Sequence, residues 1–263
     1  EQGAPRPRAG PGRAIGDGAM RTYAIGDIHG QIDLLRAAHD RIAADRRRCG
    51  DDAAPVVHVG DLVDRGPDCA GVIDWLMRGQ HAGENWVVLK GNHDRMFATF
   101  LDDPKAQDPG LRSQYSYLHP AIGGGATLIS YGVANAADRP LEPVHAEAVD
   151  LVPAEHRTFL AGLPTSFQRG SALFVHAGIR PGVALEEQTE TDLLWIRAPF
   201  HEHSAPHPWL VVHGHTAIET PVHYGNRVNI DTRAAYGGPL TAVVVEEGEV
   251  FTLGPRGRSR LLP

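Results

Sequence analysis

Short apolar runs alternate with segments of helical periodicity along the first 101 residues. The runs predict buried strands at 21–26, 55–60 and 86–89. Apolar positions at helical spacing predict helices at 31–48, 70–78 and 95–101. Because strand and helix alternate three times, this half is typical of an α/β fold with parallel strands.

The second half of the chain has a different pattern. Residues 102–151 hold loops, a run of three glycines and few strand-like segments, which predicts a mostly helical insertion able to shape a substrate groove. A helix at 153–163 and strands at 173–176 and 209–212 follow. Glycine-containing turns divide residues 222–253, which predicts an antiparallel meander. We expect two stacked mixed sheets with helices outside them.

Composition and charge limit the possible domain organisation, binding partners and location of the protein. We expect residues 1–20, rich in Pro, Gly and Arg, to be a flexible extension, and 21–263 to be one catalytic domain. The net charge of −7 argues against a nucleic-acid binder, so an anionic substrate needs a local positive site. No apolar run is long enough to cross a membrane, and two cysteines are too few for a disulfide framework. A cytoplasmic setting fits best.

Five short segments share one design, a strand followed by a turn that carries metal-ligand residue types. They are Gly26–Gly30, Gly60–Gly66, Gly91–Asp94, His176–Gly178 and Gly214–Thr216. Sites in α/β sheets form just past the carboxyl ends of strands, so these turns can converge. Each turn alone is a common cap or loop motif, but five in order after strands are not.

The residue types in these turns predict a centre for two divalent ions. Imidazole with carboxylate suits manganese, iron or zinc, and manganese is our first expectation. The predicted ligands are Asp27, His29, Asp61, Asn92, His176 and His215. Asp27 and His29 lie two residues apart and can face one ion, while Asp61 can bridge both. Two such ions about 4 Å apart clamp the attacking and leaving oxygens of an in-line displacement and make a bridging hydroxide available near neutral pH.

Four further residues supply the remaining chemistry. His93 follows a predicted ligand and is the candidate general acid, with Asp64 orienting its imidazole. Arg65 offers a planar fork for phosphate oxygens, and Arg197 is a second such fork. For Asp94, capping of the following helix is the simplest account.

At these residues the chain resembles the serine/threonine-type phosphoprotein phosphatases, within the calcineurin-like metallophosphoesterase superfamily. The motifs that carry the resemblance are GDIHG, GDLVDRG, GNHD, HAG and GHT, and it looks closest to compact bacterial and bacteriophage lambda-type members. The resemblance implies an αββα sandwich, a dinuclear site usually active with manganese, hydrolysis of phosphomonoesters, and phosphate binding by Arg65, Arg197 and Asn92.

The sequence also departs from that family. Asp94 stands where eukaryotic members usually have Glu, and the eukaryotic carboxyl-terminal SAPNYC-like segment is absent. Arg233 stands where bacterial relatives often have Gly, which adds a cation near the expected site mouth. The symmetrical diadenosine tetraphosphate hydrolases resemble the chain in GDIHG, GNHD and HAG, but usually carry Ala where Asp64 stands.

The leading hypothesis is therefore a metal-dependent phosphatase acting on phosphorylated proteins or peptides, at phosphoserine, phosphothreonine or phosphotyrosine. The first alternative is symmetrical hydrolysis of diadenosine tetraphosphate, and the second is a catalytically silent phosphopeptide-binding scaffold. Asp64 favours the protein phosphatase, while the full set of ligand and acid residues argues against the scaffold.

Overall fold

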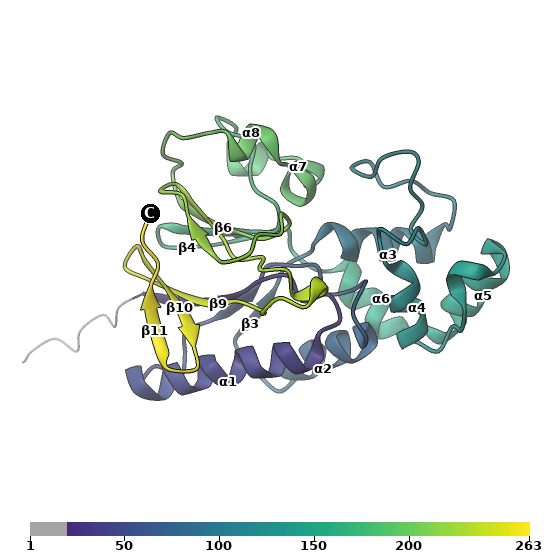
Figure 1. Cartoon of the computed structure of the whole chain (residues 1–263), viewed down its shortest axis with the longest axis horizontal. Helices are drawn as coiled ribbons and strands as arrows, with labels where there is room; N and C mark the ends of the chain where they lie inside the picture. Colours follow the sequence, from purple (N-terminus) through teal and green to yellow (C-terminus); the bar gives the residue numbers. More distant parts are fainter. Residues whose placement is uncertain (1–19) are drawn as a thin grey trace, which may run out of the picture.

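The computed structural model describes residues 20–263, in which two β-sheets lie face to face with helices outside them (Figure 1). The first sheet has the strand order β11 (Gly257–Arg260), β10 (Glu249–Gly254), β9 (Ala242–Glu246), β1 (Arg21–Ile25), β2 (Val56–His58) and β3 (Trp86–Val88). The second has the order β4 (Ser166–Arg169), β5 (Ala172–Val175), β6 (Leu210–His213), β8 (Arg227–Asn229) and β7 (Val222–His223).

Strand direction divides each sheet into a parallel part and an antiparallel part. Strands β1, β2 and β3 are parallel in the first sheet, and β5, β6 and β8 are parallel in the second. Antiparallel β9, β10 and β11 extend the first sheet, while β4 and β7 are antiparallel edges of the second. The predicted α/β fold with two mixed sheets is confirmed.

The helices form three groups around the sheets (Figure 1). Helices α1 (Ile32–Cys49) and α2 (Cys69–His81) cover the first sheet, and α7 (Glu190–Trp195) and α8 (Ala198–His201) cover the second. A third group lies at one end, formed by α3 (Asn92–Asp102), α4 (Gly124–Ser130), α5 (Leu141–Leu151) and α6 (Ala154–Ala161). Short 3-10 turns occupy Ala136–Asp138, Leu185–Glu187 and Ala234–Tyr236. No helix among residues 20–263 is long and apolar enough to cross a membrane.

Buried apolar side chains fill the space between the two sheets. Val57 and Val243 from the first sheet meet Phe174, Val212 and Val228 from the second in one cluster, all of them fully buried. Alternation within each strand sends every second residue into this layer. The opposite faces pack against the helices, so both sheets are covered on both sides, and the carboxyl ends of the parallel strands are held at one edge.

The arrangement of strands differs from the sequence prediction in two respects. The strands in 222–253 do not form one meander: β7 and β8 join the second sheet, and only β9, β10 and β11 form a meander. Alternation of polar and apolar residues cannot tell which of two sheets a strand joins. Strand β4 was not predicted because it is a half-exposed edge strand.

The insertion and the first helix of the site also differ in detail. Within 102–151, residues 103–123 form no helix, and helical structure begins only at α4. Helix α3 begins at Asn92 rather than at 95, so Asn92 and His93 occupy its first turn. Asp94 accepts a hydrogen bond from the backbone N of Gly91 at 2.7 Å, which confirms its predicted capping role. The predicted extension 1–20 lies outside the described residues, except Met20.

A buried carboxylate secures helix α1 to the first sheet. Asp45 accepts hydrogen bonds from Tyr23 Oη at 2.9 Å and from Arg258 Nε and Nη2 at 2.8 and 2.7 Å. Burial by itself would raise the pKa of Asp45, but the hydrogen bonds from Arg258 and Tyr23 lower it below the ordinary value. The carboxylate is therefore charged at neutral pH.

We expect Asp45→Asn to lower the free energy of unfolding by about 2 kcal/mol at pH 7, because it removes one charged partner of a buried pair. Urea unfolding followed by circular dichroism measures the change, with the exposed Asp40→Asn on the same helix as control. Since the folded pKa is depressed, the stabilisation is present above the unfolded pKa and lost as pH falls through the folded one. If the difference in free energy of unfolding between the wild type and Asp45→Asn stayed constant on acidification, this account would be contradicted.

Candidate metal centre and active site

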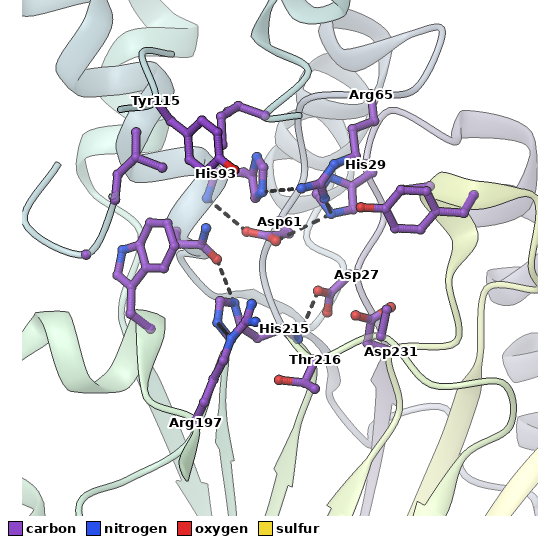
Figure 2. Close-up of a pocket in the computed structure, with 18 of the residues that line it drawn as sticks. Asp27, His29, Asp61, Arg65, His93, Tyr115, Arg197, His215, Thr216 and Asp231 are labelled. Carbon is purple, nitrogen blue, oxygen red and sulfur yellow. Dashed lines mark hydrogen bonds and ion pairs between the residues drawn. The ribbon is translucent and has the colours of Figure 1, made fainter. Parts of the chain in front are cut away.

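The turns that follow five parallel strands converge at one edge of the two sheets. They surround a pocket of about 570 Å³ (Figure 2). Eight of the ten predicted site residues line it, namely Asp27, His29, Asp61, Arg65, Asn92, His93, Arg197 and His215. The other two, Asp64 and His176, are fully buried and contact members of this set. The structure thus brings together every predicted site residue, although their roles stay predictions.

Left-handed backbone recurs in these turns. His29, Asp61, Asp64, Arg65 and His215 have φ values of 44°, 51°, 71°, 69° and 67°. Such values cost free energy for residues with a Cβ, and they persist only where surrounding contacts enforce them. Backbone N atoms of Ile28 and His29 both donate to the carbonyl of Asp61, at 3.0 and 2.8 Å, and hold the first two turns together.

Asp61 lies at the centre of the polar groups (Figure 2). Its Oδ2 is 3.4 Å from His29 Nε2, and its Oδ1 is 3.3 Å from His176 Nε2. Burial alone would raise the pKa of Asp61, but His176, His93 and His29 lower it well below the ordinary value. A fully charged carboxylate between two imidazoles suits a bridging ligand.

The histidine rings are fixed with one nitrogen directed inward. His29 Nδ1 donates to the carbonyl of Val63 at 2.7 Å, and His176 Nδ1 donates to that of Val59 at 2.9 Å. Burial lowers the pKa of His29 to about 3 and also lowers that of His176, so both rings are neutral at pH 7. Each Nε2 therefore offers a lone pair to the site, which is the arrangement of metal-binding histidines.

Two acceptor atoms, one on Asn92 and one on His176, face each other without a hydrogen between them. Its Oδ1 is 2.9 Å from His176 Nε2 and 2.9 Å from His215 Nδ1. Since His176 donates through its other nitrogen, its Nε2 and the Asn92 oxygen are both acceptors, beside the Asp61 carboxylate. A cation between them removes this repulsion, so the donor set fits a metal ion.

Asp27 gives a second indication that these residues fit a cation. Its Oδ2 accepts from the backbone N of His215 at 3.0 Å, whereas its Oδ1 is buried with no hydrogen-bond partner within residues 20–263. Gly214 permits this close approach, since a Cβ there would lie 1.9 Å from Oδ1. Burial and the nearby Asp231 and Asp61 raise the pKa of Asp27 well above its ordinary value. Bound cations reverse such a shift.

Two overlapping groups of side chains have the spacing of metal ligands. One contains His29, Asp61 and His93, and the other contains Asp61, His176 and His215. They share Asp61, as predicted for a bridging carboxylate. His93, however, is engaged elsewhere, because its Nδ1 is 2.6 Å from Asp64 Oδ2 and its Nε2 is 2.9 Å from Arg65 Nη2.

Asp64 is held by residues that the sequence did not indicate. Its Oδ1 accepts from Tyr117 Oη at 2.8 Å and from Thr127 Oγ1 at 2.6 Å, while its backbone N donates to Thr127 Oγ1. Both partners come from the insertion, 53 and 63 residues further along the chain. With Oδ1 occupied, Oδ2 is left for His93, and the imidazole is fixed in one orientation.

The predicted phosphate-binding arginines lie on two sides of the pocket (Figure 2). Arg65 reaches His29 Nε2 at 2.8 Å as well as His93, and its guanidinium lies 5.4 Å from the Tyr236 ring centroid. Arg197 Nε is 3.1 Å from His215 Nε2. Arg233 lies outside the pocket lining, where its guanidinium pairs with Glu219 at 2.7 Å. Asp231, which lies two residues after the end of β8 and was not predicted, lines the pocket beside Asp27.

Comparison with known proteins assigns this site to a family. The model of the calcineurin-like phosphoesterases matches residues 20–244. The chain belongs to this family. Its members use divalent metal ions, and the donor set described above fits them. Membership of the superfamily is confirmed, whereas the serine/threonine branch within it stays a prediction.

Similar proteins with names fall into two activity groups. A bis(5'-nucleosyl)-tetraphosphatase PrpE, of the asymmetrical kind, from Halalkalibacterium halodurans is 26% identical over 90% of this chain and 95% of its own length. Serine/threonine-protein phosphatase 1 of Salmonella typhimurium is 27% identical over 85% of this chain and 91% of its own. A solved structure described as a candidate diadenosine tetraphosphatase has a TM-score of 0.62 at 21% identity, covering 94% of this chain and 96% of that one, which supports the fold.

Metal analysis tests the predicted ligand set. We expect about two divalent ions per chain after reconstitution, and a clear loss of bound metal in Asp61→Asn, because Asp61 is common to both ligand groups. Elemental analysis after gel filtration gives the ratio. His223→Gln, a half-exposed histidine on β7, is the control and should keep the wild-type ratio. Undiminished binding in Asp61→Asn would remove Asp61 from the ligand set.

Proposed function

We propose that this metallophosphoesterase hydrolyses dinucleoside polyphosphates such as diadenosine tetraphosphate. This proposal ranks the first alternative from the sequence above protein dephosphorylation. The relatives named as bis(5'-nucleosyl)-tetraphosphatases support it, since the match to the Halalkalibacterium protein covers 90% of this chain. Protein dephosphorylation remains the second candidate, supported by the Salmonella relative and by the presence of Asp64.

The shape and lining of the pocket carry the proposal. Above the candidate metal ligands, the walls are formed largely by aromatic and aliphatic side chains, namely Leu111, Tyr115, Ile122, Trp195 and Tyr236. A phosphate bound at the metal centre would use only the floor of a 570 Å³ pocket. Flat apolar walls above a phosphate site suit a nucleobase, because every base has a face that stacks on aromatic rings.

The residues of the chain divide the reaction between binding and proton transfer. Arg65 and Arg197 bind non-bridging oxygens of the scissile phosphate, and Asp64 holds the Nδ1–H of His93 so that Nε2 delivers a proton to the leaving oxygen. Arg65 donates to His93 Nε2, so Nε2 carries no proton in this arrangement. A bound phosphate competes for the Arg65 donor, and the freed Nε2 takes up from solvent the proton that it then delivers to the leaving oxygen. Divalent ions held by Asp27, His29, Asp61, Asn92, His176 and His215 would supply the nucleophile and neutralise phosphate charge.

A substrate comparison tests the proposed function. We expect kcat/KM for diadenosine tetraphosphate to exceed that for phosphoserine, phosphothreonine and phosphotyrosine peptides by at least about tenfold, since only the dinucleotide fills the walls as well as the floor. Chromatography of the products also locates the cleavage: two ADP indicate symmetrical and ATP plus AMP asymmetrical hydrolysis. A preference for phosphopeptides would support the second candidate, and absence of turnover with all of them would favour the silent scaffold.

The proton-transfer roles are tested with p-nitrophenyl phosphate and with the dinucleotide. We expect His93→Asn to lower kcat for the dinucleotide about tenfold or more, with bound metal unchanged, because the departing phosphate oxygen then receives no proton from the imidazole as its bond breaks. Asp64→Asn should act through the same imidazole, so the double variant should be little worse than His93→Asn alone. Independent, multiplying losses would show that Asp64 does not act through His93.

A further inference from the structure

An ordered loop from the insertion forms one wall of the pocket, and the mechanism above does not use it. This loop is 107–115, which we call the insertion loop. It contributes Gly110, Leu111, Arg112 and Tyr115 to the pocket lining. Figure 2 shows Tyr115 on the same side of the pocket as His93, opposite Arg197.

The insertion loop is fixed by polar side-chain contacts rather than by regular structure. Arg95, on α3, donates through Nε and Nη2 to the buried Asp108 carboxylate at 2.7 and 2.8 Å. The side-chain amide of Gln107 lies within hydrogen-bond distance of three backbone carbonyls, those of Leu111, Arg112 and Tyr115. Such contacts hold the loop in place before a ligand arrives, which lowers the ordering cost of binding.

Gly110 brings the insertion loop against helix α7. A Cβ at this position would lie 2.3 Å from Cγ and Cδ1 of Trp195, so only glycine permits the observed contact with the indole. The Trp195 ring also lies edge-on to His215, with ring centroids 5.8 Å apart. Its Nε1 is buried and has no hydrogen-bond partner among the described residues. The indole therefore connects the loop to the candidate metal centre.

Arg112 carries a charge that the protein does not neutralise. It lines the pocket and is exposed, and its side chain makes no ion pair or hydrogen bond within residues 20–263. The other two arginines of the pocket, Arg65 and Arg197, have contacts with site histidines. One phosphate is sufficiently bound by two guanidinium forks and two metal ions, whereas each further phosphate of a chain adds negative charge.

We propose that the insertion loop and Trp195 form a nucleotide-binding arm, in which Arg112 binds a phosphate adjacent to the scissile one and Leu111 and Trp195 receive the attached nucleobase. This inference rests on the proposed function and names the ligand chemistry, an unbroken chain of at least two phosphates ending in a nucleoside. Tyr115 closes the wall on the side of His93. The arm makes Arg112 a specificity residue rather than a catalytic one.

Product-type inhibitors test the arm without requiring that the dinucleotide be a substrate. Hydrolysis of p-nitrophenyl phosphate is measured at fixed free metal with phosphate, tripolyphosphate or ATP as inhibitor. We expect Arg112→Gln to raise the inhibition constants of tripolyphosphate and ATP about tenfold and to leave that of phosphate within about twofold. Arg112→Lys should recover most of the loss, and Arg36→Gln, an exposed arginine on α1, should change none of them.

The outcomes separate the arm from the proposed function. Equal changes for phosphate, tripolyphosphate and ATP, or no change, would overturn the arm even if diadenosine tetraphosphate is the preferred substrate. The reverse result is also distinct, since a selective effect of Arg112→Gln in an enzyme that prefers phosphopeptides would keep the arm and reject the dinucleotide as substrate. Trp195→Phe should raise the inhibition constant of ATP more than that of tripolyphosphate. An equal rise for both would show that Trp195 does not bind the nucleobase.

Discussion

Three buried carboxylates beside one another are the constraint on which the site depends. One of these carboxylates follows each of three strands. Asp27 follows β1 and Asp61 follows β2 in the first sheet, and Asp231 follows β8 in the second. Burial and mutual repulsion raise the pKa of Asp231 to about 6 and that of Asp27 well above its ordinary value. Cations relieve this cost, so the fold and the metal content of the protein are thermodynamically linked.

The remaining features of the site follow from that constraint. Neutral histidines with one nitrogen bonded to backbone carbonyls supply lone pairs without adding charge, and left-handed turns at residues such as His29 and Asp61 aim the ligands inward. The strained left-handed backbone of these turns persists because both stacked sheets are packed on their outer faces and cannot shift to relieve it. The site is therefore a property of the whole sandwich rather than of five separate motifs.

Residues that sequence reasoning located and those that it missed differ in one physical respect. Asp61 and Asn92 were found because each follows a predicted parallel strand, and strand order places such turns together. Tyr117, Thr127 and Arg112 were missed because they lie in an insertion whose path depends on individual side-chain contacts, not on periodicity. The same limit explains why the meander was misplaced, since alternation predicts a strand but not its sheet.

The insertion therefore has two functions that its sequence alone did not indicate. Through Tyr117 and Thr127 it fixes Asp64, and with it the imidazole of His93, so the orientation of this candidate general acid depends on the insertion. Through the insertion loop it also forms a pocket wall beside Trp195. Relatives named for two different activities match this chain at nearly the same identity, so overall similarity does not decide the substrate. An insertion that fixes the candidate acid through one set of residues and lines the pocket with another can change specificity while the metal centre stays the same, because Asp64 is held by Tyr117 and Thr127 whereas Arg112 lies on the insertion loop.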